Sequence, residues 1–214
     1  MLPFDAEVLF SFFAQYNRDI WPAQVVAVLL CALAFFFVFR PKATSGRSIG
    51  AILVASWATC GIVFHYLQFA ALNFAAPLYA AFFLAQALLL GWALLVRSRE
   101  FRFRRDAFGR GGVALSALGI IGYPLIDGLA GHGWSGVRLV GVTPSPTTLF
   151  TVGLLLLLEG KTPLYLLVIP LLWSLVDGAT AWLFATYEDL VLPIATIGGI
   201  GLAIFKSRSL RRSA

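Results

Sequence analysis

Charged residues are scarce in this sequence of 214 residues, and so are cysteine, histidine and methionine. Only 12% of the residues are Asp, Glu, Lys or Arg, whereas soluble domains average about 25%. With so little charge and 60% hydrophobic residues, the chain is not expected to fold in water without a covering for its apolar surface. The composition therefore predicts a protein surrounded by lipid.

The shortage of cysteine and histidine excludes several kinds of site. Cys31 and Cys60 both fall in apolar stretches and form neither a disulfide framework nor a CxxC pair. His65 and His132 are far apart, so there is no HExxH zinc motif, and neither a GxSxG elbow nor a GK[ST] phosphate loop is present. The sequence leaves open whether the protein is an enzyme, and it identifies no catalytic residue, metal or cofactor.

Long apolar runs are what the sequence does contain. They are close to the length of about 20 residues that a helix needs to cross a bilayer. They predict an all-α, polytopic transmembrane bundle over residues 20–205, preceded by an outer amphipathic segment, 1–19, and followed by a basic tail, 206–214. Of about seven spans, the fifth is short and interrupted by proline. The predicted spans are Ile20–Phe39, Ile49–Leu72, Phe74–Val96, Gly112–Gly131, Pro146–Leu158, Pro163–Ala185 and Leu190–Phe205.

Lysine and arginine are unevenly distributed between the two sides of this bundle. All except Arg18 and Arg138 lie in the segments that follow the first, third, fifth and seventh predicted spans. Loops rich in lysine and arginine stay in the cytoplasm during membrane insertion. The bias therefore predicts an outside N-terminus and a cytoplasmic C-terminus.

The most basic segment, residues 97–110, alternates arginine with phenylalanine in the run RSREFRFRRDAFGR. Such a pattern can bind nucleic acid, but beside a predicted span it favours contact with anionic lipid headgroups. We therefore expect the partner of this segment to be a bilayer with anionic lipid at its cytoplasmic face, and we expect no nucleic acid.

Three ionisable side chains, His65, Asp127 and Asp177, lie within predicted spans. At a rise of about 1.5 Å per residue, all three fall in the outer third of a hydrocarbon core about 30 Å thick. Such groups are costly in lipid and are usually functional. The pattern predicts an outward-facing polar pocket, although each side chain could instead pair structurally with a neighbour. Polar residues at similar or shallower depth are Gln68, Asn73, His132, Ser135, Glu188 and Asp189.

The start of the fifth predicted span is also unusual. Pro144 and Pro146 disrupt regular helix there, so we expect an extended or re-entrant segment followed by a half-helix that begins near Pro146. Thr147 and Thr148 are then placed to offer hydroxyls at the start of that half-helix. Broken helices of this kind form substrate sites in many transporters, and the alternative is a long outer loop packed over the bundle.

Several stretches together resemble a known but uncharacterised family. They are YNRDIWPAQ (16–24), FHYLQFAALNFAA (64–76), GHGW (131–134), GVTPSPTTLFTVGLLLL (141–157) and IPLLWSL (169–175). They are similar to a domain-of-unknown-function family of bacterial polytopic inner-membrane proteins, sometimes labelled permeases. The resemblance implies a multi-pass protein of the bacterial inner membrane and supplies no activity. The family pattern often has cysteine at Ser145 and a small residue at Asp177.

The leading functional prediction is a membrane protein whose outward-facing pocket binds or transports a small solute or ion. His65 would respond to protonation or ligand, with hydrogen bonds supplied by its polar neighbours. One alternative is an accessory or assembly subunit of a larger membrane complex, and another is a periplasm-facing membrane enzyme. Each of these three functions is compatible with a homo-oligomer or with a membrane-protein partner. The expected ligand-binding residues are His65, Gln68, Asn73, Asp127, His132, Thr147, Thr148 and Asp177.

Overall fold

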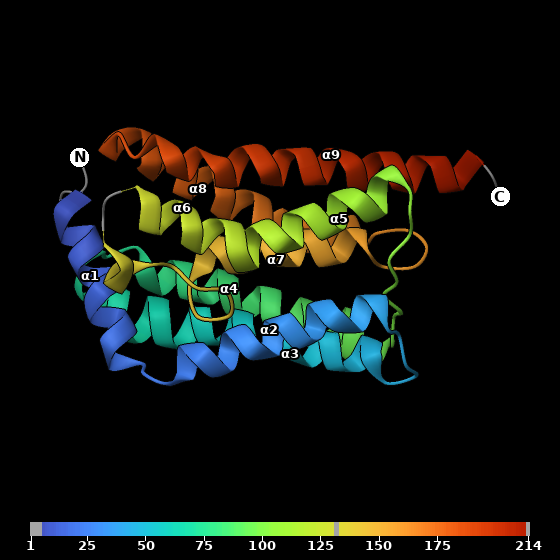
Figure 1. Cartoon of the computed structure of the whole chain (residues 1–214), viewed down its shortest axis with the longest axis horizontal. Helices are drawn as coiled ribbons and strands as arrows, with labels where there is room; N and C mark the ends of the chain where they lie inside the picture. The colour runs from blue at the N-terminus through green and yellow to red at the C-terminus, as the bar shows by residue number, and fades with distance from the viewer. Residues whose placement is uncertain (1–5, 131–132, 213–214) are drawn as a thin grey trace.

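The computed structural model describes residues 6–130 and 133–212, and within these ranges the chain is a bundle of helices without a β-strand (Figure 1). The all-α prediction is confirmed. The α-helices are α1 (Ala6–Asp19), α2 (Ala23–Phe39), α3 (Ser45–Thr59), α4 (Ala76–Leu90), α5 (Ala107–Ala117), α6 (Tyr123–Leu129), α7 (Pro144–Leu156), α8 (Val168–Phe184) and α9 (Val191–Arg212).

Several of these helices are extended by segments of other helical type. Three π-helical segments continue α3, α4 and α5, and short 3₁₀ turns precede α8 and α9 or occupy the loops. The π-helical segments are η1 (Cys60–Gln68), η3 (Gly91–Val96) and η4 (Leu118–Gly122), and the 3₁₀ turns are η2 (Phe69–Ala71), η5 (Trp134–Gly136), η6 (Leu164–Leu167) and η7 (Tyr187–Leu190).

Five continuous helical segments in the described chain are long and apolar enough to cross a membrane. A sixth span results if α1 and α2, which are bent by 88° relative to each other, are counted together. The remaining predicted span corresponds to α7, which has only 13 residues. Seven spans therefore stay a prediction. The five segments are Ser45–Ala71, Ala76–Val96, Ala107–Leu129, Leu164–Phe184 and Tyr187–Leu210.

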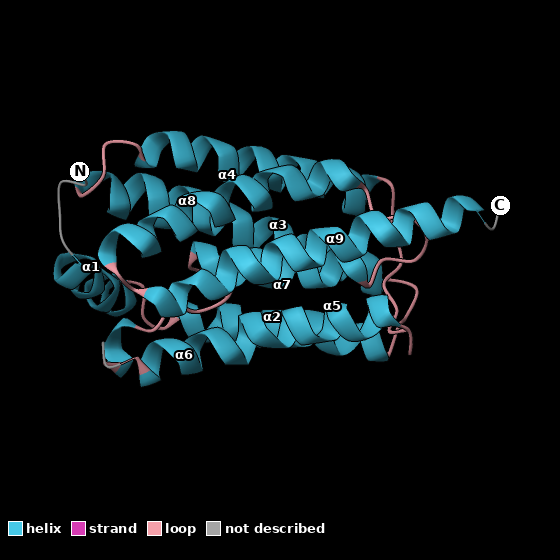
Figure 2. Ribbon diagram, turned by 90° about the horizontal axis from the view of Figure 1, so that it is seen from above, coloured by secondary structure: helices cyan, strands magenta, loops and turns pink. Residues whose placement is uncertain are grey.

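Helix α1 lies across one end of the bundle, which we call the α1 end (Figure 2). Its apolar face buries Phe13 and Tyr16 against Phe64 and Phe69 at the end of the α3–η1 segment. The opposite face carries exposed polar residues such as Gln15. The segment 1–19 thus contains an amphipathic helix, as its pattern predicts.

Helix α7 occupies the centre of the bundle, where all 13 of its residues are buried. It contacts α3, α5, α8 and α9. Its contact with α5 depends on glycine: a Cβ atom on Gly112 would lie 2.8 Å from the carbonyl oxygen of Gly153, and one on Gly153 would overlap Ser116. Close backbone approach through small residues is the usual way to pack helices in lipid.

The basic segments 40–44 and 97–106 gather at the end of the bundle that carries the C-terminus, opposite α1 (Figure 1). We call it the C-terminal end. Helix α9 continues to Arg212, and Lys206, the first residue of the expected basic tail 206–214, is buried. The ammonium of Lys206 donates hydrogen bonds to the carbonyl oxygens of Leu156 and Leu158, the last residues of α7 and its C-terminal turn.

Candidate functional site

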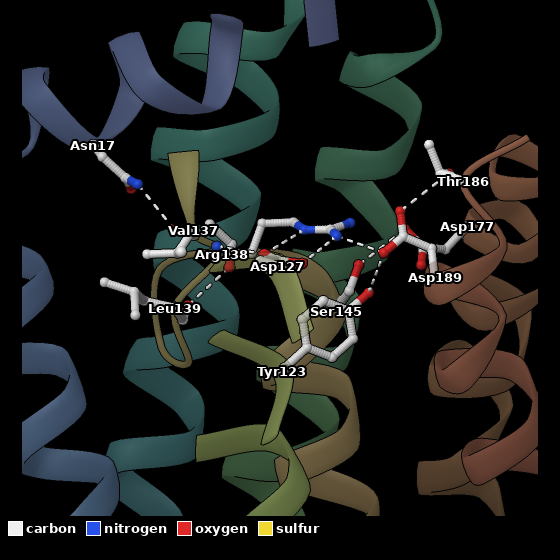
Figure 3. Close-up of polar contacts among 11 residues, drawn as sticks. Asn17, Tyr123, Asp127, Val137, Arg138, Leu139, Ser145, Asp177, Thr186 and Asp189 are labelled. Atoms are coloured by element: carbon white, nitrogen blue, oxygen red, sulfur yellow. Dashed lines mark hydrogen bonds and ion pairs between the residues drawn. The ribbon is translucent and has the colours of Figure 1, made fainter. Parts of the chain in front are cut away.

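The segment that joins α6 to α7 is held in place by α1. The side-chain amide of Asn17 donates hydrogen bonds of 2.9 Å to the carbonyl oxygens of both Ser135 and Val137 (Figure 3). The hydroxyl of Tyr16 donates to the carbonyl oxygen of Val142 at 2.8 Å. Irregular backbone inside a helical bundle needs such partners, because its polar groups would otherwise be unsatisfied.

This clamped segment carries Arg138, whose side chain is buried in a cluster of ions. Its Nε donates to Asp127 at 2.9 Å, its backbone N–H donates to the same carboxylate at 2.7 Å, and its Nη2 contacts both Asp127 and Asp189. The three side chains are 5%, 7% and 9% exposed. Burial alone would lower the pKa of Arg138, but the facing Tyr123 and the two carboxylates raise this pKa above its ordinary value. Arg138 is therefore a permanent cation.

Two aromatic rings enclose the guanidinium group. Its central carbon lies 5.3 Å from the ring centre of Phe13 and 4.9 Å from that of Tyr123. Asp189 is held in turn by the hydroxyl of Thr186, which donates to it at 3.3 Å. Cation–π contacts and charge-assisted hydrogen bonds together offset the cost of removing these charges from water.

A cavity of about 70 Å³ opens beside this cluster. Its volume is sufficient for a few water molecules or for a small polar group. Aromatic and aliphatic side chains form much of its wall, including Phe13, Phe64 and Trp173. Polar residues of its wall come from the hairpin before α4, the α6–α7 segment, α7, α8 and the residues between α8 and α9, and they are Asn73, Arg138, Ser145, Asp177, Thr180, Thr186 and Asp189.

Asp177 belongs to the wall of this cavity and has one carboxylate oxygen without a hydrogen-bond partner in the described protein. Its Oδ1 accepts a hydrogen bond of 2.9 Å from the hydroxyl of Ser145 (Figure 3). Its Oδ2 is shielded from solvent and has no hydrogen-bond partner in the described protein. Buried polar atoms are almost always paired, so an unpaired carboxylate oxygen in a cavity wall indicates a site for a donor or a cation.

The predicted residues are only partly brought together. Asp127 and Asp177 belong to the same polar region, with Asp127 behind Arg138 and Asp177 in the cavity wall. Asn73 also lines the cavity, and its Oδ1 accepts the backbone N–H of Ala75 in the hairpin before α4. These three residues keep a place in the candidate site.

His65 lies outside the lining of the cavity and is completely buried. Neither ring nitrogen has a hydrogen-bond partner among the residues that the structure describes. Gln68, further along η1, is half-buried and also lies outside the lining. The imidazole of His65 is surrounded by the rings of Phe64, Phe69, Tyr79, Phe83 and Trp173, at centroid distances between 4.7 and 6.2 Å.

Thr147 and Thr148 are fully buried and bond to their own helix. Their hydroxyls donate to the carbonyl oxygens of Thr143 and Pro144, at 2.6 and 2.9 Å. In this structure they stabilise the first turn of α7 and do not face the cavity. The half-helix itself begins two residues before the expected Pro146. His132 falls outside the described residues.

Sequence reasoning placed neither Arg138 nor Ser145 in a site, and it assigned Asp189 no partner. In the sequence, Arg138 stands out only because it is one of the two basic residues, with Arg18, on the predicted outer side. That isolation was a usable signal, because an arginine in an otherwise uncharged segment that follows a deep aspartate suggests an internal ion pair. Ser145 and Trp173 carried no comparable signal.

Metal binding receives no support from the site geometry. Among residues 6–130 and 133–212, no three His, Cys, Asp or Glu side chains gather closely enough to hold a metal ion. Within the described residues, the candidate site is a small cavity whose wall includes Arg138, the carboxylates of Asp177 and Asp189 and several aromatic rings, with Asp127 paired to Arg138 behind the wall.

The helices define the class of protein: the chain has the long apolar helices of a multi-pass membrane protein. Its family is also shown. The family of unknown function DUF6064 matches residues 6–214, so the chain belongs to that family. No curated protein and no solved structure matches it.

Proposed function

We propose that this protein is a multi-pass protein of the bacterial inner membrane whose cavity faces outward and binds a small solute with a cationic group. The observation that carries the proposal is the unpartnered Oδ2 of Asp177 in the cavity wall. Among the described residues, the region holds Asp127, Asp177 and Asp189 and one cation, Arg138, so its formal charge is negative. A positively charged donor complements both the charge and the free acceptor.

The outward orientation rests on the distribution of basic residues. The segments 40–44 and 97–106 lie at the C-terminal end (Figure 1). The cavity lies at the α1 end, because Leu9 and Phe13 of α1 belong to its wall. If the basic segments face the cytoplasm, the cavity opens to the periplasm. Solutes would therefore reach it from outside the cell.

Binding is the part of this function that the geometry supports directly. Below the cavity, α7 is buried along its whole length and packs on α5 through Gly112 and Gly153. Passage of a solute to the C-terminal end would require these helices to separate. Transport would therefore take the form of alternating access and not of an open channel.

The test is a thermal-unfolding titration of the purified protein in detergent, with ethanolamine, tetramethylammonium and sodium as probes. A ligand that binds only the folded state stabilises it by about 2.7 kcal/mol at 100 times its Kd. We expect ethanolamine to raise the Tm of the wild type but not that of Asp177→Asn, which keeps the acceptor for Ser145 and removes the charge.

The matched control is Asp19→Asn, because Asp19 is an exposed carboxylate on α1 outside the cavity. This variant should respond to ethanolamine like the wild type. The proposal fails if no cation stabilises the wild type, or if Asp177→Asn responds as the wild type does. Native mass spectrometry of the gently extracted protein adds a second readout, since stoichiometric unrelated subunits without a bound small molecule would favour the accessory-subunit alternative.

A further inference from the structure

An apolar groove runs between α4 and α8 on the surface of the bundle. Its volume is about 370 Å³, and its wall is formed by aliphatic and aromatic side chains. Leu78 is 58% exposed, Leu172 47% and Leu175 50%, so the groove is open sideways. Both helices belong to segments long and apolar enough to cross a membrane, so an opening between them faces hydrocarbon.

The groove adjoins the polar cavity. Tyr79, Trp173 and Val176 line both. Asp177 follows directly on α8 and belongs to the cavity wall, whereas Ile169 marks the far limit of the groove on the same helix. The eight residue steps from Ile169 to Asp177 correspond to about 12 Å along a helix. A polar recess in the outer third of a core about 30 Å thick thus continues into an apolar channel that runs about 12 Å toward the opposite face.

The order of these surfaces matches a membrane lipid. A lipid in the outer leaflet has its polar headgroup at the boundary and its chains directed toward the bilayer centre. The cavity lies at the α1 end, and the lining of the groove continues from it along α4 and α8 toward the middle of the bundle. A water-soluble solute would use the cavity alone and would leave the groove without a role.

The charges in the cavity select among headgroups. Asp177 offers an unpartnered carboxylate oxygen for an ammonium group. Arg138 also lines the cavity, and its hydrogen bonds to the described protein use Nε, Nη2 and the backbone N–H. Its Nη1 therefore has capacity for an anion. An acceptor for an amine and a donor for a phosphate on the same cavity wall complement a headgroup that carries both.

We propose that the cavity and the groove together bind one phospholipid with a primary amine in its headgroup, with the amine at Asp177 and an acyl chain between α4 and α8. The inference rests on the proposed function and names the class of its solute. The aminoethyl end of such a headgroup has three non-hydrogen atoms, which suits a cavity of about 70 Å³. A trimethylammonium headgroup has the same charge, but it is bulkier and has no N–H donor.

The experiment is native mass spectrometry of the full chain released from nanodiscs. The nanodiscs contain equal amounts of phosphatidylethanolamine, phosphatidylcholine and phosphatidylglycerol with identical chains. We expect each wild-type protein to keep one phosphatidylethanolamine molecule bound. The amount of bound phosphatidylethanolamine should exceed that of bound phosphatidylcholine at least tenfold. Asp177→Asn should lose this preference.

A variant that fills the groove separates the lipid inference from the proposed function. Leu172→Trp places a large ring in the groove and should reduce lipid retention at least fivefold without changing stabilisation by soluble ethanolamine. The matched control is Leu183→Trp, at an exposed position of α8 outside the groove. Thermal unfolding without added ligand confirms that both variants are folded.

The outcomes are distinguishable. The lipid inference is wrong if soluble ethanolamine stabilises the wild type but lipid retention shows no headgroup preference. It is also wrong if Leu172→Trp retains lipid as Leu183→Trp does. In either case the cavity remains a site for a soluble amine. If neither ethanolamine nor phosphatidylethanolamine distinguishes the wild type from Asp177→Asn, the proposed function fails as well.

Discussion

Among single residues, Arg138 is the one that pairs the buried carboxylates at the α1 end. It is a buried cation shared between Asp127 and Asp189, and its guanidinium lies over the rings of Phe13 and Tyr123. Buried ion pairs add little net stability, but removal of one partner leaves the other charge uncompensated in a medium of low dielectric constant. The cluster is therefore a place where small chemical changes have large effects.

Asp127→Asn should lower the free energy of unfolding by about 3–5 kcal/mol, because Arg138 then loses its bidentate carboxylate while it stays buried. Chemical denaturation followed by tryptophan fluorescence in detergent measures the change. Asp19→Asn removes an exposed carboxylate and should change stability by less than about 0.5 kcal/mol. Equal stability of the two variants would mean that the cluster is hydrated and not desolvated.

His65→Phe should leave the fold intact and keep the free energy of unfolding within about 1 kcal/mol of the wild type or raise it. The imidazole makes no hydrogen bond to the described protein and is enclosed by aromatic rings, so a ring without nitrogen atoms fits the same surroundings. Stabilisation by ethanolamine should be unchanged. Loss of that response in a folded variant would return His65 to the site.

The partners of individual side chains were the feature that the sequence predicted least well. The presence of Asp127 and Asp177 within long apolar helices followed from the sequence, because charged positions in apolar runs are easy to recognise. Their partners did not follow, since Arg138 lies in an irregular segment whose path depends on contacts with Asn17 and Tyr16. The surroundings of His65 depend on rings from α4 and α8, which no local pattern brings together.

Among the elements, α7 and its contact with α5 determine how closely the centre of the bundle packs. The two helices approach through Gly112 and Gly153, and a Cβ atom at either position would come within overlap distance of the other helix. The ammonium of Lys206 covers the carbonyl oxygens at the end of α7. Both features fix the helix against its neighbours without any contact with lipid.

Gly153→Ala should destabilise the protein by about 1–3 kcal/mol, because the added methyl group meets Ser116 and the backbone of Gly112. Gly201→Ala is the matched control on α9, where a Cβ atom has nothing within 4 Å. It should be neutral or stabilise by up to about 1 kcal/mol, since alanine favours helix. Thermal unfolding of the two variants in one detergent gives the comparison, and similar Tm values would argue against a tight α5–α7 contact.

Whole-molecule architecture followed from the sequence more completely than the site did. Most expected spans agree with observed helices within a few residues, as with Phe74–Val96 and Ala76–Val96, because apolar length and flanking charge are local signals. The last helix is longer than the expected span, because α9 continues beyond Phe205 to Arg212. Lys206 is buried, and its ammonium bonds to the end of α7, which no local pattern indicates.

The predicted orientation can be tested with single cysteines in whole cells. Cys31 and Cys60 are fully buried, so labelling of the native protein by a membrane-impermeant maleimide should be low. Ser11→Cys on α1 should be labelled from the periplasm, and Lys161→Cys at the opposite end only after the inner membrane is opened. The reverse pattern would place the cavity on the cytoplasmic side.

The burial of α7 has a consequence for how the chain is made. A segment of 13 residues is too short to be released into lipid as an independent span, and its partners include α8 and α9, which are synthesised after it. The nascent chain must therefore keep α7 in a protected place, such as the insertion machinery or the groove left by earlier helices, until the last two helices arrive. Chains that end before α8 will have synthesised α7 but will lack part of the surface that receives it, and they should be substrates for membrane proteases.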